Sequence, residues 1–252
     1  MLRNYIFFSW LFMAVFSLPV LAQRTGQESP MSLSLIGIQY TYNFPYEDLD
    51  DRFGPISAIG GSYTFKHNSN FYISGEYNFL FNGNVRENPV SNIASPSTGL
   101  LIDGDGRFDL MELQLRGTMV QAKIGKIFPV AGPNANSGIA VAAGAGFMEH
   151  RIHFNTRSDK LPQLEGEYKK GYDRLTNGWL LSQSIGYFHL SNSGFVNFQA
   201  SIEITEGFTQ NRRDWDNQLM RRLDEPRLDL MAGLRLTWYI PLYKRSGSTQ
   251  FY

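Results

Sequence analysis

Residues 196–205 alternate without interruption between apolar and polar side chains. The apolar positions are Val196, Phe198, Ala200, Ile202 and Ile204. An α-helix would repeat its apolar positions every three to four residues, so this period of two predicts a β-strand. Such a strand separates apolar from polar surroundings. It does so either in a sheet over a hydrophobic core or in a barrel wall between lipid and lumen.

Seven further segments show the same alternation. In chain order, the eight predicted strands span residues 32–42, 54–66, 71–81, 108–120, 137–154, 178–190, 195–209 and 228–243. Most exceed the roughly 9–11 residues with which a tilted strand crosses a bilayer, and all exceed the five or six that are about usual for soluble sheets. In the fourth segment the alternation loses its phase near residues 121–126, where we expect a β-bulge.

Long and short connections alternate along the chain. They span residues 43–53, 67–70, 82–107, 129–136, 155–177, 191–194 and 210–227. Outer-membrane barrels have long external loops and short periplasmic turns, whereas a soluble sandwich gives no reason for this order. A chain that starts in the periplasm makes its first connection outside, and the first connection here is a long one. The sequence therefore predicts an all-β fold, an antiparallel up-and-down transmembrane β-barrel of eight strands with both termini in the periplasm.

The two faces of the predicted strands suit lipid and lumen. The outward positions, which include Leu113 and Leu115 of the fourth strand, carry no charge at mid-strand, where a charge would cost about 2–4 kcal/mol. The charged inward positions are Glu76, Glu112, Arg116, Glu203, Asp229 and Arg235. Side chains fill the interior of an eight-stranded barrel, so we expect these six to form a paired charge network in the lumen. A narrow conduit is the alternative.

Residues 1–22 have the layout of a secretory signal peptide. Arg3 precedes an apolar run from Tyr5 to Leu18, Pro19 ends the run, and Ala22 provides a small residue at the cleavage position. The run is shorter than the roughly 20 residues of a membrane-spanning helix. We therefore expect export with cleavage, a barrel domain over residues 23–252, and an integral position in the bacterial outer membrane.

Composition narrows the classes of function. The chain has no cysteine, which excludes disulfide scaffolds, thiolate zinc sites and cysteine nucleophiles. Its 23 Lys and Arg residues balance its 23 Asp and Glu residues, so its charge gives no reason to expect nucleic acid.

The signal peptide, the eight amphipathic strands and the aromatic-rich last strand together resemble the small bacterial outer-membrane barrels of the OmpA/OmpX type. Three stretches are similar to uncharacterised barrel proteins of the Bacteroidota: KIFPV with GPNANSG (126–138), EYKKGYDRLTNG (167–178) and WYIPLYKR (238–245). The resemblance implies a location and a fold but no activity. Some barrels of this size in that phylum look like accessory subunits of outer-membrane secretion or assembly machines.

One short sequence resembles a catalytic motif. His189 and Ser191 stand in a His-x-Ser-Asn sequence similar to that of the outer-membrane lipid A deacylases, and Glu203 follows as a possible acid. However, Glu203 lies far along the next strand, on the order of 30 Å from the turn at about 3.3 Å per residue. A catalytic triad needs a direct hydrogen bond between acid and histidine. We therefore expect no catalytic residues.

No metal or cofactor site is expected either. His150 and His153 are three residues apart on a predicted strand, so they face opposite ways and cannot share a metal. Asp103 and Asp105 resemble the start of a calcium loop, but the position of its closing glutamate is occupied by Gln114.

Basic and aromatic residues gather in the last two long loops. They are Lys169, Lys170, Arg174, Arg212, Arg213, Trp215, Arg221 and Arg222. A guanidinium group binds oxyanions through two hydrogen bonds, so this surface is a candidate for anionic phosphate groups or for a protein partner. The alternative is a solvated surface that touches lipopolysaccharide without specificity.

Our primary hypothesis is a non-enzymatic outer-membrane barrel with structural or partner-binding loops, as an accessory subunit of an outer-membrane secretion or assembly complex. Its expected partners are outer-membrane lipid, lipopolysaccharide and other proteins of such a complex. The alternatives are a narrow channel or conduit for a small hydrophobic ligand, and a lipid A-modifying hydrolase.

Overall fold

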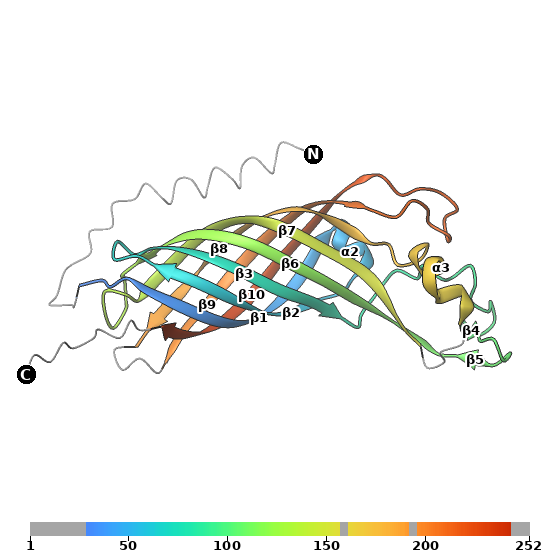
Figure 1. Ribbon diagram of the computed structural model, residues 1–252, viewed down its shortest axis with the longest axis horizontal. Helices are drawn as coiled ribbons and strands as arrows, with labels where there is room; N and C mark the ends of the chain where they lie inside the picture. The colour runs from blue at the N-terminus through green and yellow to red at the C-terminus, as the bar shows by residue number, and fades with distance from the viewer. Residues whose placement is uncertain (1–28, 157–160, 192–195, 243–252) are drawn as a thin grey trace, which may run out of the picture.

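The computed structural model describes residues 29–156, 161–191 and 196–242, so the expected signal peptide lies outside the described residues. Eight long strands form one closed barrel (Figure 1). They are β1 (Leu33–Glu47), β2 (Ile56–Lys66), β3 (Phe71–Asn82), β6 (Met111–Phe128), β7 (Gly138–Thr156), β8 (Thr176–Leu190), β9 (Asn197–Asn211) and β10 (Pro226–Leu242). Each pairs antiparallel with the barrel strands before and after it in the chain, and β10 closes onto β1. The prediction of an eight-stranded up-and-down barrel is confirmed.

The shorter elements gather at one end of the barrel. They are helix α2 (Asp48–Arg52), the hairpin of β4 (Leu101–Ile102) and β5 (Phe108–Asp109), the 3₁₀ turn Pro162–Leu164 and helix α3 (Gly166–Lys170). Figure 1 shows the long connections at this end, which we call the loop end, and the tight turns at the other. Ser34 pairs with Leu242, so both ends of the described barrel lie at the turn end. Within the described residues, no helix is long and apolar enough to cross a membrane.

The stagger of the strands explains why this barrel is narrow. Residues paired directly across strands can be followed once around the barrel, from Ile36 on β1 through Tyr63 on β2 and onward to Leu230 on β10. Leu230 pairs with Tyr46, so the circuit returns to β1 ten residues beyond its start. Strand number and stagger together set the diameter, and eight strands leave an interior that side chains fill.

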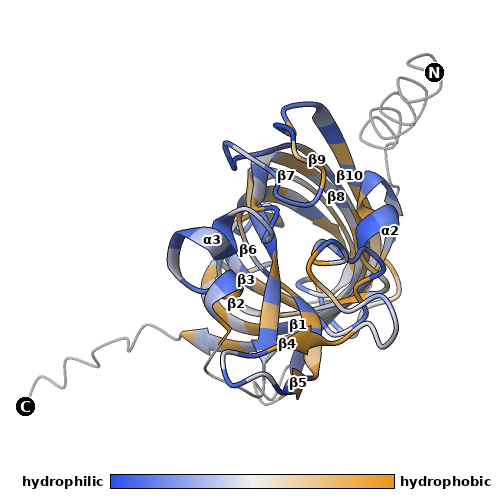
Figure 2. Ribbon diagram, turned by 90° about the vertical axis from the view of Figure 1, so that its right-hand side faces the viewer, coloured by the Kyte–Doolittle hydropathy of each residue, from blue (hydrophilic) through white to orange (hydrophobic). Residues whose placement is uncertain are grey.

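The outer and inner faces of the strands differ sharply. Outward side chains such as Ile38, Ile124 and Leu234 are about 60% exposed (61%, 62% and 60%) although they are aliphatic. Inward side chains at mid-barrel are polar or charged and buried. Figure 2, which looks onto the loop end, shows this alternation of hydropathy along the strands and places α2 and α3 on opposite sides of the mouth.

Strand β6 corrects the sequence prediction in two respects. It pairs without interruption with β3 over residues 115–126 and with β7 over residues 111–128, so it contains no bulge near residues 121–126. Its phase is also the reverse of the one predicted, because Leu115 is buried inside the barrel whereas Val120 and Ile124 are exposed outside. The inward positions change along the strand from apolar at the loop end to polar at mid-barrel, and this change resembles a loss of phase in the sequence.

Candidate functional site

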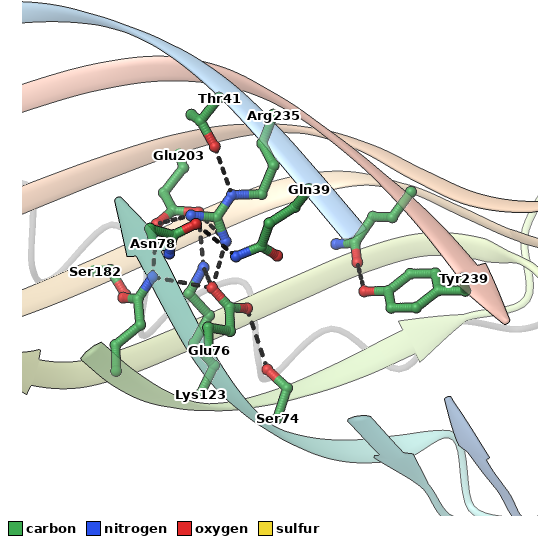
Figure 3. Close-up of polar contacts among 12 residues, drawn as sticks. Gln39, Thr41, Ser74, Glu76, Asn78, Lys123, Ser182, Glu203, Arg235 and Tyr239 are labelled. Atoms are coloured by element: carbon green, nitrogen blue, oxygen red, sulfur yellow. Dashed lines mark hydrogen bonds and ion pairs between the residues drawn. The ribbon is translucent and has the colours of Figure 1, made fainter. Parts of the chain in front are cut away.

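Four charged side chains meet inside the barrel: Glu76 from β3, Lys123 from β6, Glu203 from β9 and Arg235 from β10 (Figure 3). Lys123 Nζ lies 3.1 Å from Glu76 Oε2 and 2.7 Å from Glu203 Oε2. Arg235 Nη1 lies 2.5 Å from Glu76 Oε2 and 3.0 Å from Glu203 Oε2. Each acid therefore contacts both bases, and the cluster is neutral. We call these four residues the luminal quartet.

Neutral polar side chains connect the quartet to the barrel wall. Gln121 donates hydrogen bonds to both acids, at 3.0 Å to Glu76 and 3.3 Å to Glu203. Ser182 donates to Gln121 at 2.8 Å, and Arg235 Nε donates to the Thr41 hydroxyl at 3.1 Å. Buried charges are tolerated only when they are paired and hydrogen-bonded, and these contacts meet that condition.

Apolar side chains fill the barrel on both sides of the quartet. Toward the turn end, the Phe188 ring packs against Tyr239 at 5.2 Å and against Tyr72 at 6.2 Å between centroids. Toward the loop end lies a larger buried cluster that includes Leu80 and Met148. The cavity beside the quartet has a volume of about 10 Å³, roughly the space of one water molecule. The interior of the described barrel is packed.

The structure brings together only part of the predicted luminal network. Glu76, Glu203 and Arg235 join the quartet, whereas Glu112 and Arg116 lie on outward positions of β6. Their assignment to the lumen was wrong because the phase of β6 was taken from Leu113 and Leu115. The same error hid Lys123, the fourth member of the quartet. Its signal in the sequence was the polar alternation of residues 121 and 123 with apolar neighbours at 120, 122 and 124.

Asp229 is buried in the lumen but apart from the quartet. Its Oδ2 lies 2.9 Å from His150 Nε2 and accepts a hydrogen bond from the Thr209 hydroxyl at 2.5 Å. The Phe53 ring packs edge-on against His150, with 5.6 Å between centroids. Asp229 therefore belongs to a second polar group beneath the loop end.

A buried ion network joins all four connections at the loop end. Arg52 of α2 lies 3.2 Å from Glu87, which follows β3. Arg174, which precedes β8, pairs with Glu87 and lies 2.8 Å from Asp216 in the β9–β10 loop. Burial, and then repulsion from Arg227 and Arg174, lowers the pKa of Arg52 to about 9. Arg52 is still charged at neutral pH, so the network is a set of ion pairs.

Helix α2 packs against β1 and β10 at one side of the mouth of the barrel. Leu49 and Phe53 are fully buried in the apolar cluster of the loop end. Asp48 anchors the helix to β10, because its carboxylate accepts a hydrogen bond from the Leu228 backbone N–H at 2.7 Å. Together with the ion network, this helix makes the loop end a packed cap.

A cleft of about 400 Å³ opens on this cap between α3 and the β9–β10 loop. Two of the side chains that line it are exposed rings, Tyr168 (70% exposed) and Trp215 (48%). Three are cations, Lys170, Arg212 and Arg213. The structure thus brings together four members of the predicted loop surface, and adds Tyr168, whose place in the helix EYKK could have marked it.

The three cations of the cleft differ in their partners. Arg213 is paired with Asp173 at 2.5 Å, and Lys170 is paired with Glu167 at 2.6 Å. Arg212 Nε donates to the amide oxygen of Asn177 at 2.6 Å, and the described residues offer it no carboxylate within ion-pair distance. Arg212 is therefore held in place by a neutral group, and its charge faces the cleft.

The remaining predicted loop residues lie outside the cleft. Arg174 is buried in the ion network, and Lys169 lies 5.9 Å from the centre of the Phe154 ring. Arg221 pairs with Glu225 at 2.8 Å, and Arg222 approaches Asp224 at 4.0 Å, both at the surface. None of these four residues lines the cleft.

The possible catalytic and metal-binding residues are not assembled. His189 lies outside the barrel wall, where its ring stacks on Phe198 at 5.1 Å, whereas Glu203 is in the lumen. The Asp103 carboxylate accepts hydrogen bonds from the backbone N–H groups of Asp105 and Arg107, as in an ordinary turn. In the part of the chain that the structure describes, no three His, Cys, Asp or Glu residues are grouped to hold a metal.

Comparisons with known proteins gave structural likenesses alone. No protein-family model matches the chain, and no curated protein matches it. Among solved structures it is similar to Ail of Yersinia pestis in complex with the heparin analogue sucrose octasulfate, at 11% identity and a TM-score of 0.45, over 83% of this chain and 98% of that one. It is also similar to Neisserial surface protein A, at 10% identity and a TM-score of 0.45, over 86% of this chain and 99% of that one. A third similar structure is E. coli outer membrane protein W, at 11% identity and a TM-score of 0.35, over 82% of this chain and 98% of that one.

Proposed function

We propose that this chain is an integral outer-membrane β-barrel with a closed lumen, and that its loop end binds a partner without catalysing a reaction. The observation that carries the proposal is the distribution of side chains: aliphatic residues such as Ile124 and Leu234 cover the outside, and the luminal quartet lies inside. In water this arrangement would be unstable, because exposing apolar area costs about 25 cal/mol per Å². In a bilayer it is the favourable arrangement.

The lengths of the connections support one orientation in the membrane. The loop end faces the outside, and the turn end, with both ends of the chain, faces the periplasm, in keeping with the usual distribution of long and short connections. A signal peptide over residues 1–22 would deliver the chain to that compartment. The outer surface is in contact with outer-membrane lipid and lipopolysaccharide.

The partner surface is the cleft between α3 and the β9–β10 loop. Its exposed Tyr168 and Trp215 rings and the unneutralised Arg212 are the residue types that dominate binding energy at protein interfaces. The ion network of Arg52, Glu87 and Arg174 supports this surface from below, so that little order has to be gained on binding. An accessory role in an outer-membrane secretion or assembly complex, and kinship with barrels of the Bacteroidota, belong to this proposal.

The alternatives lack support from the geometry. A conduit for ions or for a small hydrophobic ligand needs an open path, whereas the cavity at the quartet holds about 10 Å³. A lipid A hydrolase needs His189 and an acid in contact, and these side chains lie on opposite faces of the wall.

The test is affinity purification from native membranes with a tag on the mature chain. We expect the same proteins to co-purify with wild type and with Arg222→Gln, and to be lost with Arg212→Gln combined with Trp215→Ala. Barrel integrity is checked by the shift in gel mobility on heating. Equal recovery of partners from all three would refute the cleft as the partner surface, and a protein that fractionates with the soluble periplasm would refute the barrel in the membrane.

A further inference from the structure

Two arginines face each other on the outside of the barrel. Arg116 on β6 pairs directly with Arg151 on β7. Both point outward, because they share the faces of Val120 and Phe147, which are exposed. Side chains in directly opposed positions start about 4.5–5.5 Å apart at their Cβ atoms, and like charges placed there destabilise a sheet.

Nothing in the described structure neutralises this pair. Arg116 Nη2 donates to Gln114 Oε1 at 2.6 Å, and its guanidinium lies 5.9 Å from the centre of the Phe79 ring. The described residues place no carboxylate within 4 Å of either guanidinium. Two acids on the same face of β6 and β7, Glu112 and Glu149, accept hydrogen bonds from asparagine amides.

The height of the pair in the barrel is informative. The exposed apolar band of β6 and β7 ends at Val120 and Phe147, and the arginines lie four residues further toward the loop end. Four residues of strand span about 13 Å, and less than that along the membrane normal because the strands are tilted. If the chain spans the outer membrane as proposed above, Arg116 and Arg151 stand at the level of the outer-leaflet headgroups.

An apolar groove crosses the same two strands on the turn-end side of the arginines. It has a volume of about 790 Å³, and its lining is almost entirely apolar. Its floor consists of small residues paired across three strands, Gly75, Ala122 and Ala145. Its rim toward the loop end carries Val120 and Phe147. The shape suits hydrocarbon chains that lie against the wall.

We propose that Arg116 and Arg151 bind the phosphate of an outer-leaflet glycolipid, a phosphorylated lipopolysaccharide, whose acyl chains occupy this groove. One phosphate dianion between two guanidinium groups accepts charge-assisted hydrogen bonds from both. It also converts their mutual repulsion into attraction. The proposal rests on the proposed position in the outer membrane and adds a lipid site on the barrel wall, separate from the cleft.

The test uses the mature protein refolded in a zwitterionic detergent and titrated with purified rough lipopolysaccharide. Combined Arg116→Gln and Arg151→Gln should weaken the apparent affinity at least tenfold, whereas Arg222→Gln should leave it within twofold. Lipopolysaccharide with its phosphates removed should bind wild type and the double variant alike. Ala122→Phe, which fills the groove, should weaken binding of the lipid. Equal affinity of wild type and double variant would overturn the proposal.

Two further measurements complete the test. One distinguishes a lipid phosphate from a free anion, and the other distinguishes binding by the two arginines from a purely structural role. Inorganic phosphate at millimolar concentration should compete poorly, and full competition would overturn the lipid in favour of a free anion. Without lipid the double variant should melt no lower than wild type, because repulsion is relieved, while wild type should gain more in Tm when lipopolysaccharide is added. The site would also be overturned if the double variant had a lower Tm than wild type without lipid and both proteins gained equally in Tm when lipopolysaccharide was added. Loss of the heat-dependent gel shift in wild type would instead refute the proposed barrel in the membrane.

Discussion

The luminal quartet allows a quantitative prediction for Arg235→Met. Arg235 contacts Glu76 at 2.5 Å and Glu203 at 3.0 Å, and it donates to Thr41 at 3.1 Å. Methionine fills similar space but leaves two carboxylates with Lys123 as their one base, so the cluster gains a net charge of −1 in a packed interior. Removal of one partner of a buried ion pair costs about 3–5 kcal/mol. We expect the free energy of unfolding to fall by that amount.

A second substitution separates uncompensated charge from lost packing. Glu203→Gln in the Arg235→Met background leaves Glu76 and Lys123 as a neutral pair 3.1 Å apart. The double variant should therefore be more stable than the sum of the single effects predicts, by an interaction energy of about 1–3 kcal/mol. Urea unfolding of the barrel in lipid vesicles, followed by tryptophan fluorescence, measures both, with an unchanged m-value as the check that the same structure unfolds.

Two results would refute this reasoning. A cost below about 1 kcal/mol for Arg235→Met would mean that water reaches the quartet and screens its charges, as at a protein surface. Additive effects in the double variant would mean that the residues do not interact. Arg222→Gln, at an exposed loop position, is the matched control and should stay within about 0.5 kcal/mol.

The packed lumen, the cap at the loop end, the outer face of the wall and the hydrolase alternative can each be tested separately. Planar bilayers with the wild-type barrel should show no reproducible single-channel steps, and such steps would contradict the packed lumen. Leu49→Ala removes a fully buried side chain of α2, so it should cost about 2–5 kcal/mol and speed limited proteolysis of the loops, whereas unchanged cleavage would show that α2 does not hold the cap. Ile124→Arg should cost about 2–4 kcal/mol in vesicles, with Ile124→Leu near neutral, if this position faces lipid. Ser191→Ala should leave the lipid A mass spectrum unchanged, and an altered spectrum would revive the hydrolase.

For strand β6, the sequence predicts a strand but does not tell which of its two faces points into the barrel. Its loop-end half has apolar residues inward, where Leu115 packs in the cluster under α2, and polar ones outward, where Arg116 stands above the apolar band. Its other half is reversed, with Lys123 inward and Ile124 outward. A period of two identifies the strand in both halves but leaves open which set faces inward. That choice depends on what neighbouring strands and loops place inside.

The loops were less predictable still. The sequence marked a basic and aromatic surface at residues 169–174 and 212–222, but it could not separate Arg174, buried against Glu87 and Asp216, from Arg212, exposed in the cleft. In the sequence, both arginines stand among polar residues. Their roles depend on acids that come from connections more than 40 residues away in the chain.

The sequence by itself determined an eight-stranded antiparallel barrel, because period-two alternation over long segments and alternating loop lengths are local properties that admit few closed arrangements. Only the tertiary structure decided that the barrel is packed, that Lys123 completes the quartet while Asp229 pairs with His150, and that Arg116 opposes Arg151 outside. These outcomes depend on the register of eight strands and on a stagger of ten residues from Ile36 to Tyr46. A shift of one residue in that register would turn every side chain of a strand to the other face.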